Sequence, residues 1–453
     1  MKIRIFIFSL IVFVWTYMST TLTDWESLSV SLFVFFFLEF LEDLGKKIVI
    51  LYLPGIMALI TWLIVPVIFY HVYTKSDWQA KLWLKYMPIP SDDYFSFVLP
   101  GTVAMMLGLR MPLGKLKINS NPRIYLDNVK AYLADKPKLG LILIGIGLTS
   151  GFIDFLAPES LKQVFYLLDH LTYVGVFYIL YSPSKYKRVV TLSVIALTIG
   201  QALINGMFGE LIFISALALI LILLGKKISF NRKLLLSLTG IFLIVLLQSV
   251  KFQYRQKSWK EGAGADPLYM AQLLTDKLSN PSDLIDKDKF FFVGVRLNQG
   301  WLIAVTMMRV PAKFPFANGE TIWESVAASF VPRLLWPDKP EAGGKANLKR
   351  FWGFDIHGFS MNIGPIGEAY ANFNTTGGII YMFFYGLFFN LILSTVLKMA
   401  EKRPTLILWL PFLFMYTITV ESDLLITMNS LLKALFFTWL MFRLFRSLFH
   451  IEL

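Results

Sequence analysis

Leu234–Val250 reads LLLSLTGIFLIVLLQSV, a run of 17 residues without a charge. Uncharged apolar runs of about this length are typical of helices that cross a membrane. Similar segments recur along the chain and together predict about twelve transmembrane helices. These are expected at residues 3–19, 26–41, 48–71, 93–109, 139–156, 163–181, 189–206, 209–224, 234–250, 377–397, 405–420 and 425–443. The predicted fold class is an all-α polytopic membrane protein.

The overall composition agrees with this fold class. The chain is 56% hydrophobic with a mean hydropathy of +0.61, and 16% of its residues are charged, against about a quarter in an average globular protein. The absence of cysteine excludes disulfides, thiolate catalysis and thiolate metal sites. With four histidines in all, a multi-histidine metal site is not expected either. The sequence therefore predicts no metal and no cofactor.

The net charge of +13 could indicate a nucleic-acid partner, but the positions of the basic residues favour another explanation. If the N-terminus is cytoplasmic, the inner loops and both termini hold about 23 lysines and arginines, and the short outer loops hold 4. Membrane proteins keep basic residues in cytoplasmic loops. We therefore expect both termini in the cytoplasm and no nucleic-acid partner.

This orientation places a long loop on the outer face. The chain divides into nine transmembrane helices, a large outer (periplasmic) loop and three final transmembrane helices, at residues 1–250, 251–376 and 377–453. The loop is not of low complexity, and it is expected to be partly helical. ATP and nucleotide sugars are absent from the outer face, so a reaction there must use a substrate that was activated before it crossed the membrane.

Helix signals recur within the loop. Asp266–Leu278 has the Asp cap and early proline of a helix start. Phe290–Val310 is an apolar stretch that carries Arg296, and a further helix is expected to open at Gly319. Three prolines in Phe330–Pro340 forbid a regular helix there. The expected result is a rigid, irregular connector.

The polar side chains of the loop are suited to glycan chemistry. Arg296, Arg333 and Lys339 can clamp a diphosphate, because guanidinium groups bind phosphate oxygens in pairs and lysine adds a point charge. Glu368 or His357 can take a proton from an attacking hydroxyl. Sugar contacts are expected from the side chains of Trp336, Tyr370 and Asn372.

Each of these residues also has a simpler explanation. Aromatic residues gather at membrane interfaces without any ligand. An outer-loop arginine often contacts lipid headgroups, and a histidine is often structural. Within the predicted spans the charged residues are few, namely Glu39, Glu210 and Lys433. Lys433, near the middle of the last span, is the one that needs a partner or a cavity.

Two further stretches carry a family resemblance. Val331–Pro340 (VPRLLWPDKP), Gly364–Phe373 (GPIGEAYANF) and the glycine-led span after them resemble the O-antigen polymerases, the Wzy-type polymerases of oligosaccharide repeat units. Residue matches cover about positions 290–390, and the topology is similar along the whole chain.

The resemblance implies a metal-independent glycosyltransferase of the bacterial inner membrane. Its substrate is an oligosaccharide linked to undecaprenyl diphosphate in the membrane lipid, and its expected partners are a chain-length regulator and a flippase. The resemblance also implies that Arg333 and Arg296 are the essential outer-face arginines, with Arg333 part of the catalytic site. Glu368 corresponds to the acidic residue before the late span.

Two alternatives stay open at this point. An O-antigen ligase, which transfers the glycan to lipid A core or protein, would use an outer-loop histidine such as His357. A transporter or flippase for the lipid-linked unit would usually show internal repeats and charged helices at the membrane midplane. The polar residues here gather in an outer loop, which counts against transport.

Overall fold

A computed structural model describes residues 2–73, 77, 87–114, 121–260, 266–284, 286–331, 335–357 and 360–453. The described residues fold into helices and contain no strand, so the all-α fold class is confirmed. Eight of their helices are long and apolar enough to cross a membrane. They span Lys2–Ser19, Tyr52–Val72, Leu139–Leu156, Leu161–Tyr181, Lys187–Asn205, Phe230–Ser258, Gly364–Ala400 and Leu424–Leu448.

The four remaining predicted spans are helical as well, but each lacks a feature of a membrane helix. Helices α2 (Asp24–Asp43) and α6 (Ser91–Arg110) have 20 residues each, but both begin with acidic residues, and α2 also ends with them. Gly209–Leu223 (α12) and Pro404–Thr417 are apolar and shorter.

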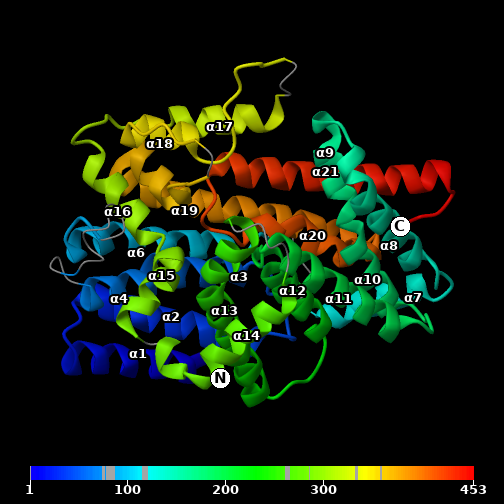
Figure 1. The fold of residues 1–453 in the computed structure, drawn as a ribbon, viewed down its shortest axis with the longest axis horizontal. Helices are drawn as coiled ribbons and strands as arrows, with labels where there is room; N and C mark the ends of the chain where they lie inside the picture. The colour runs from blue at the N-terminus through cyan, green and yellow to red at the C-terminus, as the bar shows by residue number, and fades with distance from the viewer. Residues whose placement is uncertain are drawn as a thin grey trace.

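Four helices pack in series as one layer. These are α1 (Lys2–Ser19), α2, α6 and α19 (Gly364–Ala400), and Figure 1 shows them running across the view with α21 (Leu424–Leu448) above them. The α6–α19 pair is packed backbone against backbone. A Cβ on Gly108 would lie 2.1 Å from the Phe383 carbonyl oxygen, and one on Gly386 would lie 2.1 Å from that of Met105. Small residues permit this close approach of membrane helices.

A second group of helices lies beside this layer. Helix α8 packs on α10, and α10 also contacts α9, α11 and the short helices η6 and α20. The bounds are α7 Pro122–Leu133, α8 Leu139–Ile153, α9 Glu159–Asp169, α10 Leu171–Tyr181, α11 Lys187–Asn205, η6 Pro404–Trp409 and α20 Leu410–Phe414. The span Tyr52–Val72 is built of α3 (Tyr52–Ala58), a π-helical turn η1 (Leu59–Ile64) and α4 (Val65–Val72).

The helices around the predicted outer loop extend beyond the expected boundaries. Helix α13 runs from Phe230 to Arg255, past Val250. Helix α19 begins at Gly364, before Gly377, and is kinked at Asn374, whose φ of 59° and ψ of −166° are not helical. The last part of the loop and the next span therefore form one bent helix.

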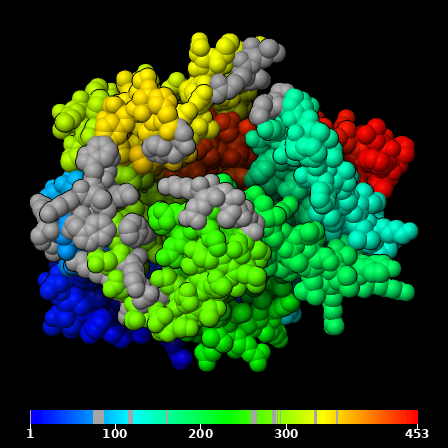
Figure 2. Space-filling model, in the orientation of Figure 1, coloured from blue at the N-terminus to red at the C-terminus, as the bar shows by residue number. Residues whose placement is uncertain are grey.

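Within the loop the predicted elements are present, with one difference. Helix α14 (Pro267–Ser279) begins after Asp266, whose side chain accepts the Tyr269 N–H at 2.9 Å. The apolar stretch expected as one unit is two helices, α15 (Lys287–Leu297) and α16 (Gly300–Arg309). The later helices are α17 (Glu320–Phe330) and α18 (Lys345–Trp352). In Figure 2 the green residues of α13 and α14 cover the centre of the visible face, and α17 and α18 lie at its upper edge.

Contacts between turns join loops that the charge distribution assigns to the same side. At one end of the bundle, Gly225 N–H donates to the Gly45 carbonyl at 2.9 Å, and Lys233 Nζ donates to the Leu41 carbonyl at 2.9 Å. At the other end, Arg255 Nε donates to the Gly206 carbonyl at 2.8 Å. We call the first end, which holds the turns at residues 44–46, 121–123 and 225–229, the basic end, and the second the loop end.

The three charged residues within predicted spans, Glu39, Glu210 and Lys433, have different surroundings. Glu39 pairs with Lys2 at 3.0 Å and with Arg110, both near the basic end. Glu210 lies 3.4 Å from the buried His170. Lys433 lies exposed on the surface of α21.

Candidate functional site

Glu368 lies at the centre of a buried polar group at the loop end. The residue starts the second turn of α19, a helix that Pro365 opens at its second position, and it is 0% exposed. Its Oε1 accepts from Asn347 Nδ2 at 2.7 Å, and its Oε2 accepts from the backbone N–H of Leu424 at 2.8 Å. Glu368 therefore joins α18, α19 and the start of α21.

Asp423 is the second carboxyl of this group. Its Oδ1 accepts the Ile426 N–H at 2.8 Å and so caps α21. Burial raises the pKa of the Asp423 carboxyl to about 6, although hydrogen bonds from the backbone of Ile426 and Gly344 favour its charged form. We call Glu368, Asp423 and Asn347 the carboxyl joint. Sequence reasoning missed Asp423 and Asn347, because nothing local in either stretch marks a partner for Glu368.

A small cavity opens on the carboxyl joint. Its volume is about 100 Å³, and Asp423 and Asn347 line it, together with Glu320, Glu324 and Arg350. At roughly 30 Å³ per water, this space admits about three waters or a hydroxyl group of a substrate. Glu368 does not line the cavity, and its Oε1 accepts from Asn347, which does. Of the two carboxyls of the carboxyl joint, that of Asp423 is the one in the cavity wall.

Asn372, expected at a sugar, is hydrogen-bonded within the protein instead. It is 0% exposed, and its Oδ1 accepts from Gly319 N–H at 3.2 Å and from Thr321 Oγ1 at 3.1 Å. Its Nδ2 donates to the Glu368 carbonyl at 2.9 Å. Asn372 thus ties the start of α17 to α19, beside the carboxyl joint.

The other predicted sugar contacts are partly buried. The Tyr370 ring packs between those of Phe97 and Phe316, with centroids 5.2 and 5.9 Å away. Trp336 is half-buried in the connector. Tyr370 therefore has an apolar packing role in the absence of any ligand.

A group of cations lies at the end of α13. Arg296 Nη2 is 3.0 Å from Glu421 Oε2, and the Arg296 side chain is 60% exposed. Lys251 lies within electrostatic range of Arg255, Arg296 and Glu421, and Arg255 within range of Arg296. We call Lys251, Arg255 and Arg296 the cation cluster. Of its members the sequence predicted Arg296, and it did not single out Lys251 or Arg255.

One short segment connects the cation cluster with the carboxyl joint. Glu421 pairs with Arg296, and two residues later Asp423 lines the cavity. Two residues of extended chain span about 7 Å. Arg296 and Glu368, which are 72 residues apart in sequence, therefore act on the same turn before α21. Two of the predicted site residues, Arg296 and Glu368, therefore meet at this turn.

The remaining predicted residues lie elsewhere or outside the described part of the chain. Lys339 Nζ donates to the Val331 carbonyl at 3.0 Å, within the connector. The His357 side chain is 83% exposed and lies 3.9 Å from Asp355. Arg333 falls outside the described residues. The described contacts of Lys339 and His357 do not join them to the cation cluster.

The fold and the site define the class of protein: in the part of the chain that the structure describes, it is all-helical, with eight helices suited to a membrane and a polar site at one end of the bundle. The family model described as domain of unknown function (DUF8712) matches residues 123–423, more than half of the chain, and the chain belongs to this family. No curated protein and no solved structure matches it. The matched range includes the cation cluster, the carboxyl joint and every residue that lines the cavity except Leu425.

Proposed function

We propose that this chain polymerises oligosaccharide repeat units carried on undecaprenyl diphosphate, at the outer face of the bacterial inner membrane. The twelve-span topology, with both termini cytoplasmic and residues 251–376 outside, is part of this proposal. It is supported by the family resemblance of the connector and of Gly364–Phe373, and by turn-to-turn contacts that agree with the charge distribution.

The observation that carries the proposal is the turn at residues 421–424. It holds Glu421 beside the cation cluster and Asp423 at the wall of the cavity. A glycosyl transfer from a lipid diphosphate needs a positive group at the leaving diphosphate and an acceptor for a proton a few ångströms away. In this turn the partner of Arg296, Glu421, and the carboxyl of Asp423 are two residues apart in the chain.

In the proposed reaction, the hydroxyl of the incoming unit attacks the anomeric carbon of the growing glycan. The new glycosidic C–O bond forms while the bond from that carbon to the diphosphate oxygen breaks. Undecaprenyl diphosphate leaves with the electron pair of the broken bond, and its charge is stabilised by Arg296, Arg255 and Lys251. Asp423 receives the hydroxyl proton. Glu368 is then a positioning residue, because it holds the Leu424 backbone next to Asp423.

Arg333, Lys339, Trp336, Tyr370 and His357 keep the roles that the sequence predicts. Arg333 and Lys339 would extend the diphosphate site, and Trp336 and Tyr370 would contact sugars. His357 remains the second candidate for the proton acceptor, and its high exposure leaves it open to a substrate.

The test is a strain that lacks this chain and carries variants of it. With Arg296→Ala, we expect single-repeat glycan to accumulate while the amount of protein is unchanged. The matched control is Lys349→Ala, an exposed cation of α18, which should keep long chains. Long lipid-linked chains in the deletion strain would indicate a ligase instead. Lipid-linked units retained on the cytoplasmic side would indicate a flippase.

A further inference from the structure

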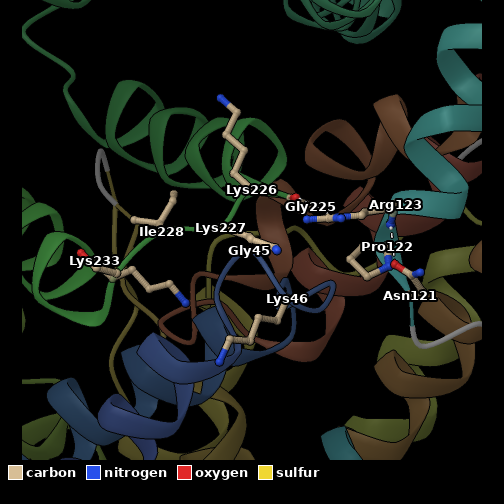
Figure 3. A pocket seen from close by; sticks show the side chains of 11 residues that line it. Gly45, Lys46, Asn121, Pro122, Arg123, Gly225, Lys226, Lys227, Ile228 and Lys233 are labelled. Atoms are coloured by element: carbon tan, nitrogen blue, oxygen red, sulfur yellow. Dashed lines mark hydrogen bonds between the residues drawn. The ribbon is translucent and has the colours of Figure 1, made fainter.

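A second polar cavity lies at the basic end of the bundle, whereas the residues of the proposed reaction lie at the loop end. It has a volume of about 530 Å³ and is bounded by three turns, those after α2, before α7 and between α12 and α13. Hydrogen bonds join these turns: Gly225 N–H donates to the Gly45 carbonyl at 2.9 Å, and Arg123 Nε donates to the Gly225 carbonyl at 3.2 Å. The cavity is therefore built by tertiary contacts between distant parts of the chain. We call it the basic cavity (Figure 3).

The lining of the basic cavity is strongly positive. Five of its eleven residues are basic and none is acidic. The basic ones are Lys46, Arg123, Lys226, Lys227 and Lys233. In Figure 3, Arg123 and Lys233 extend toward the space between the turns from opposite sides, whereas Lys226 turns away.

Lys233 differs from an ordinary surface lysine, because it is 2% exposed. Its ammonium donates to the carbonyls of Leu41 and Glu42, at 2.9 and 3.2 Å. The charge of Lys46 repels it, and those of Glu42 and Asp43 attract it. Both of these acids already have partners: Glu42 pairs with Lys46, and Asp43 with Lys47 at 2.7 Å. An anion in the cavity would recover part of the free energy lost when this ammonium is buried.

The backbone adds to the positive potential. Helix α13 has 26 residues and begins at Phe230, next to Ser229 in the cavity wall. The Ser229 side chain makes no capping hydrogen bond, so it leaves the first-turn N–H groups of α13 available. Free N–H groups and the helix dipole favour an anion at this position.

Basic residues are expected at the cytoplasmic ends of membrane helices without any ligand. A loop that is basic for this reason alone would spread its charges into solvent. Here residues of three distant turns surround one cavity, and one lysine is held in its wall against repulsion. The volume lies within the range of about 300–1,000 Å³ that is usual for ligand sites.

We propose that the basic cavity binds a phosphate-bearing anion, with Arg123 and Lys227 as direct contacts and Lys233 as the buried countercharge. The phosphate can come from the headgroup of an anionic lipid or from a soluble diphosphate. This inference does not rest on the proposed function, because the cavity shares no residue with the cation cluster or the carboxyl joint.

The experiment uses the purified full-length protein and two probes. In an uncharged detergent, inorganic pyrophosphate is titrated and its binding is measured by calorimetry. In nanodiscs of phosphatidylcholine with or without cardiolipin, the lipid that stays bound is measured by native mass spectrometry. The double variant Arg123→Gln/Lys227→Gln should weaken the binding of at least one probe roughly tenfold or more, since each charge-assisted hydrogen bond contributes about that factor.

The matched control is Lys185→Gln/Lys402→Gln, which removes two exposed charges from other loops of the basic end. It should bind both probes as the unmodified protein does. If Arg123→Gln/Lys227→Gln loses the binding of pyrophosphate alone, the bound phosphate comes from a soluble diphosphate. If it loses the retention of cardiolipin alone, the phosphate comes from a lipid headgroup. Equal weakening in both double variants would overturn the proposal, since it would show a general effect of net charge. Absence of binding of both probes to the unmodified protein would also overturn it. The variant Arg296→Ala should bind normally, which separates this test from that of the polymerase.

Discussion

Glu368 Oε2 accepts the backbone N–H of Leu424 at 2.8 Å, so a carboxylate of the predicted outer loop fixes the first residue of the last helix. Its other oxygen accepts from Asn347 at 2.7 Å, and the side chain is fully buried. A buried acceptor with two donors holds three helices in register. Glu368 therefore fixes the shape of the turn at 421–424, and it affects the proposed reaction through that shape.

The first prediction concerns the stability of the carboxyl joint. Glu368→Ala removes the acceptor of two buried donors and should lower the free energy of unfolding by roughly 2–4 kcal/mol. The measurement is unfolding of the purified protein in detergent, followed by tryptophan fluorescence. Asp127→Ala, which removes a solvent-exposed acid of α7, is the control. If Glu368→Ala stops polymerisation while the stability is unchanged, Glu368 acts directly on the substrate, and the positioning role that we assign to it is wrong.

The second prediction concerns pH. The Asp423 carboxyl has a pKa of about 6 in the folded chain and a reference value of 3.8. Between these values the folded state binds more protons than the unfolded state. The contribution of this carboxyl to the free energy of unfolding should therefore fall, by up to roughly 3 kcal/mol, as the pH rises from about 4 to about 6.

The variant Asp423→Asn isolates this effect. Its side chain has no proton to release, so the difference in stability between it and the unmodified protein should change over this pH range. Asp355→Asn, which alters an exposed acid, should reproduce the unmodified curve. Parallel curves for Asp423→Asn and the unmodified protein would contradict the raised pKa of Asp423.

The third prediction concerns the cation cluster. Under the proposed function, Arg296→Ala should reduce the rate of chain extension by roughly 10²–10³-fold, as is typical when a group that stabilises a leaving charge is removed. Arg296→Lys should recover part of the rate, because it restores the charge without the paired geometry. The assay is extension of lipid-linked repeats by the purified protein. Equal rates for the Ala and Lys variants would contradict a role for the charge.

The sequence predicts the helices better than the contacts between them. The cap at Asp266 and the early Pro267 are local signals, and the helix that they predict is confirmed. The break at Asn298 and Gln299 was missed because both residues sit inside an otherwise apolar run, where periodicity favours one helix. Packing decides it instead: the Gln299 N–H donates to the Thr61 carbonyl of the π-helical turn η1, at 3.2 Å.

The residues of the candidate site also divide into those with a local sequence signal and those defined by long-range contacts. Arg296 and Glu368 are recognisable from the composition of the loop and from the family resemblance. Glu421 and Asp423 are not recognisable, since they lie in a short turn between two predicted spans. Their role depends on Arg296 and Glu368, which lie 125 and 55 positions earlier in the chain. Lys251 and Arg255 look like the basic flank of a span, and α13 has to extend past Val250 before they can join Arg296. A single sequence contains no signal for such long-range pairs.

The fourth prediction separates packing from sugar binding at Tyr370. Its ring is held by Phe97 and Phe316, so Tyr370→Phe keeps the apolar contacts and removes the hydroxyl alone. Stability should be unchanged within about 0.5 kcal/mol. If the hydroxyl contacts a sugar, the KM for the lipid-linked repeat should rise while kcat stays similar. An unchanged KM would remove Tyr370 from the proposed sugar site.

The fifth prediction tests the orientation on which the proposed reaction depends. The chain contains no cysteine, so a single introduced thiol reports on one position without any background. Lys349 in α18 and Lys402 after α19 are exposed, and the charge distribution assigns them to opposite faces. A maleimide that cannot cross the membrane should label Lys349→Cys in intact spheroplasts and should label Lys402→Cys after lysis only. Both variants should react fully in detergent, which controls for burial of either thiol. The reverse pattern would place the cation cluster and Asp423 in the cytoplasm, where nucleotide-activated donors are available, and a substrate activated before crossing the membrane would no longer be required.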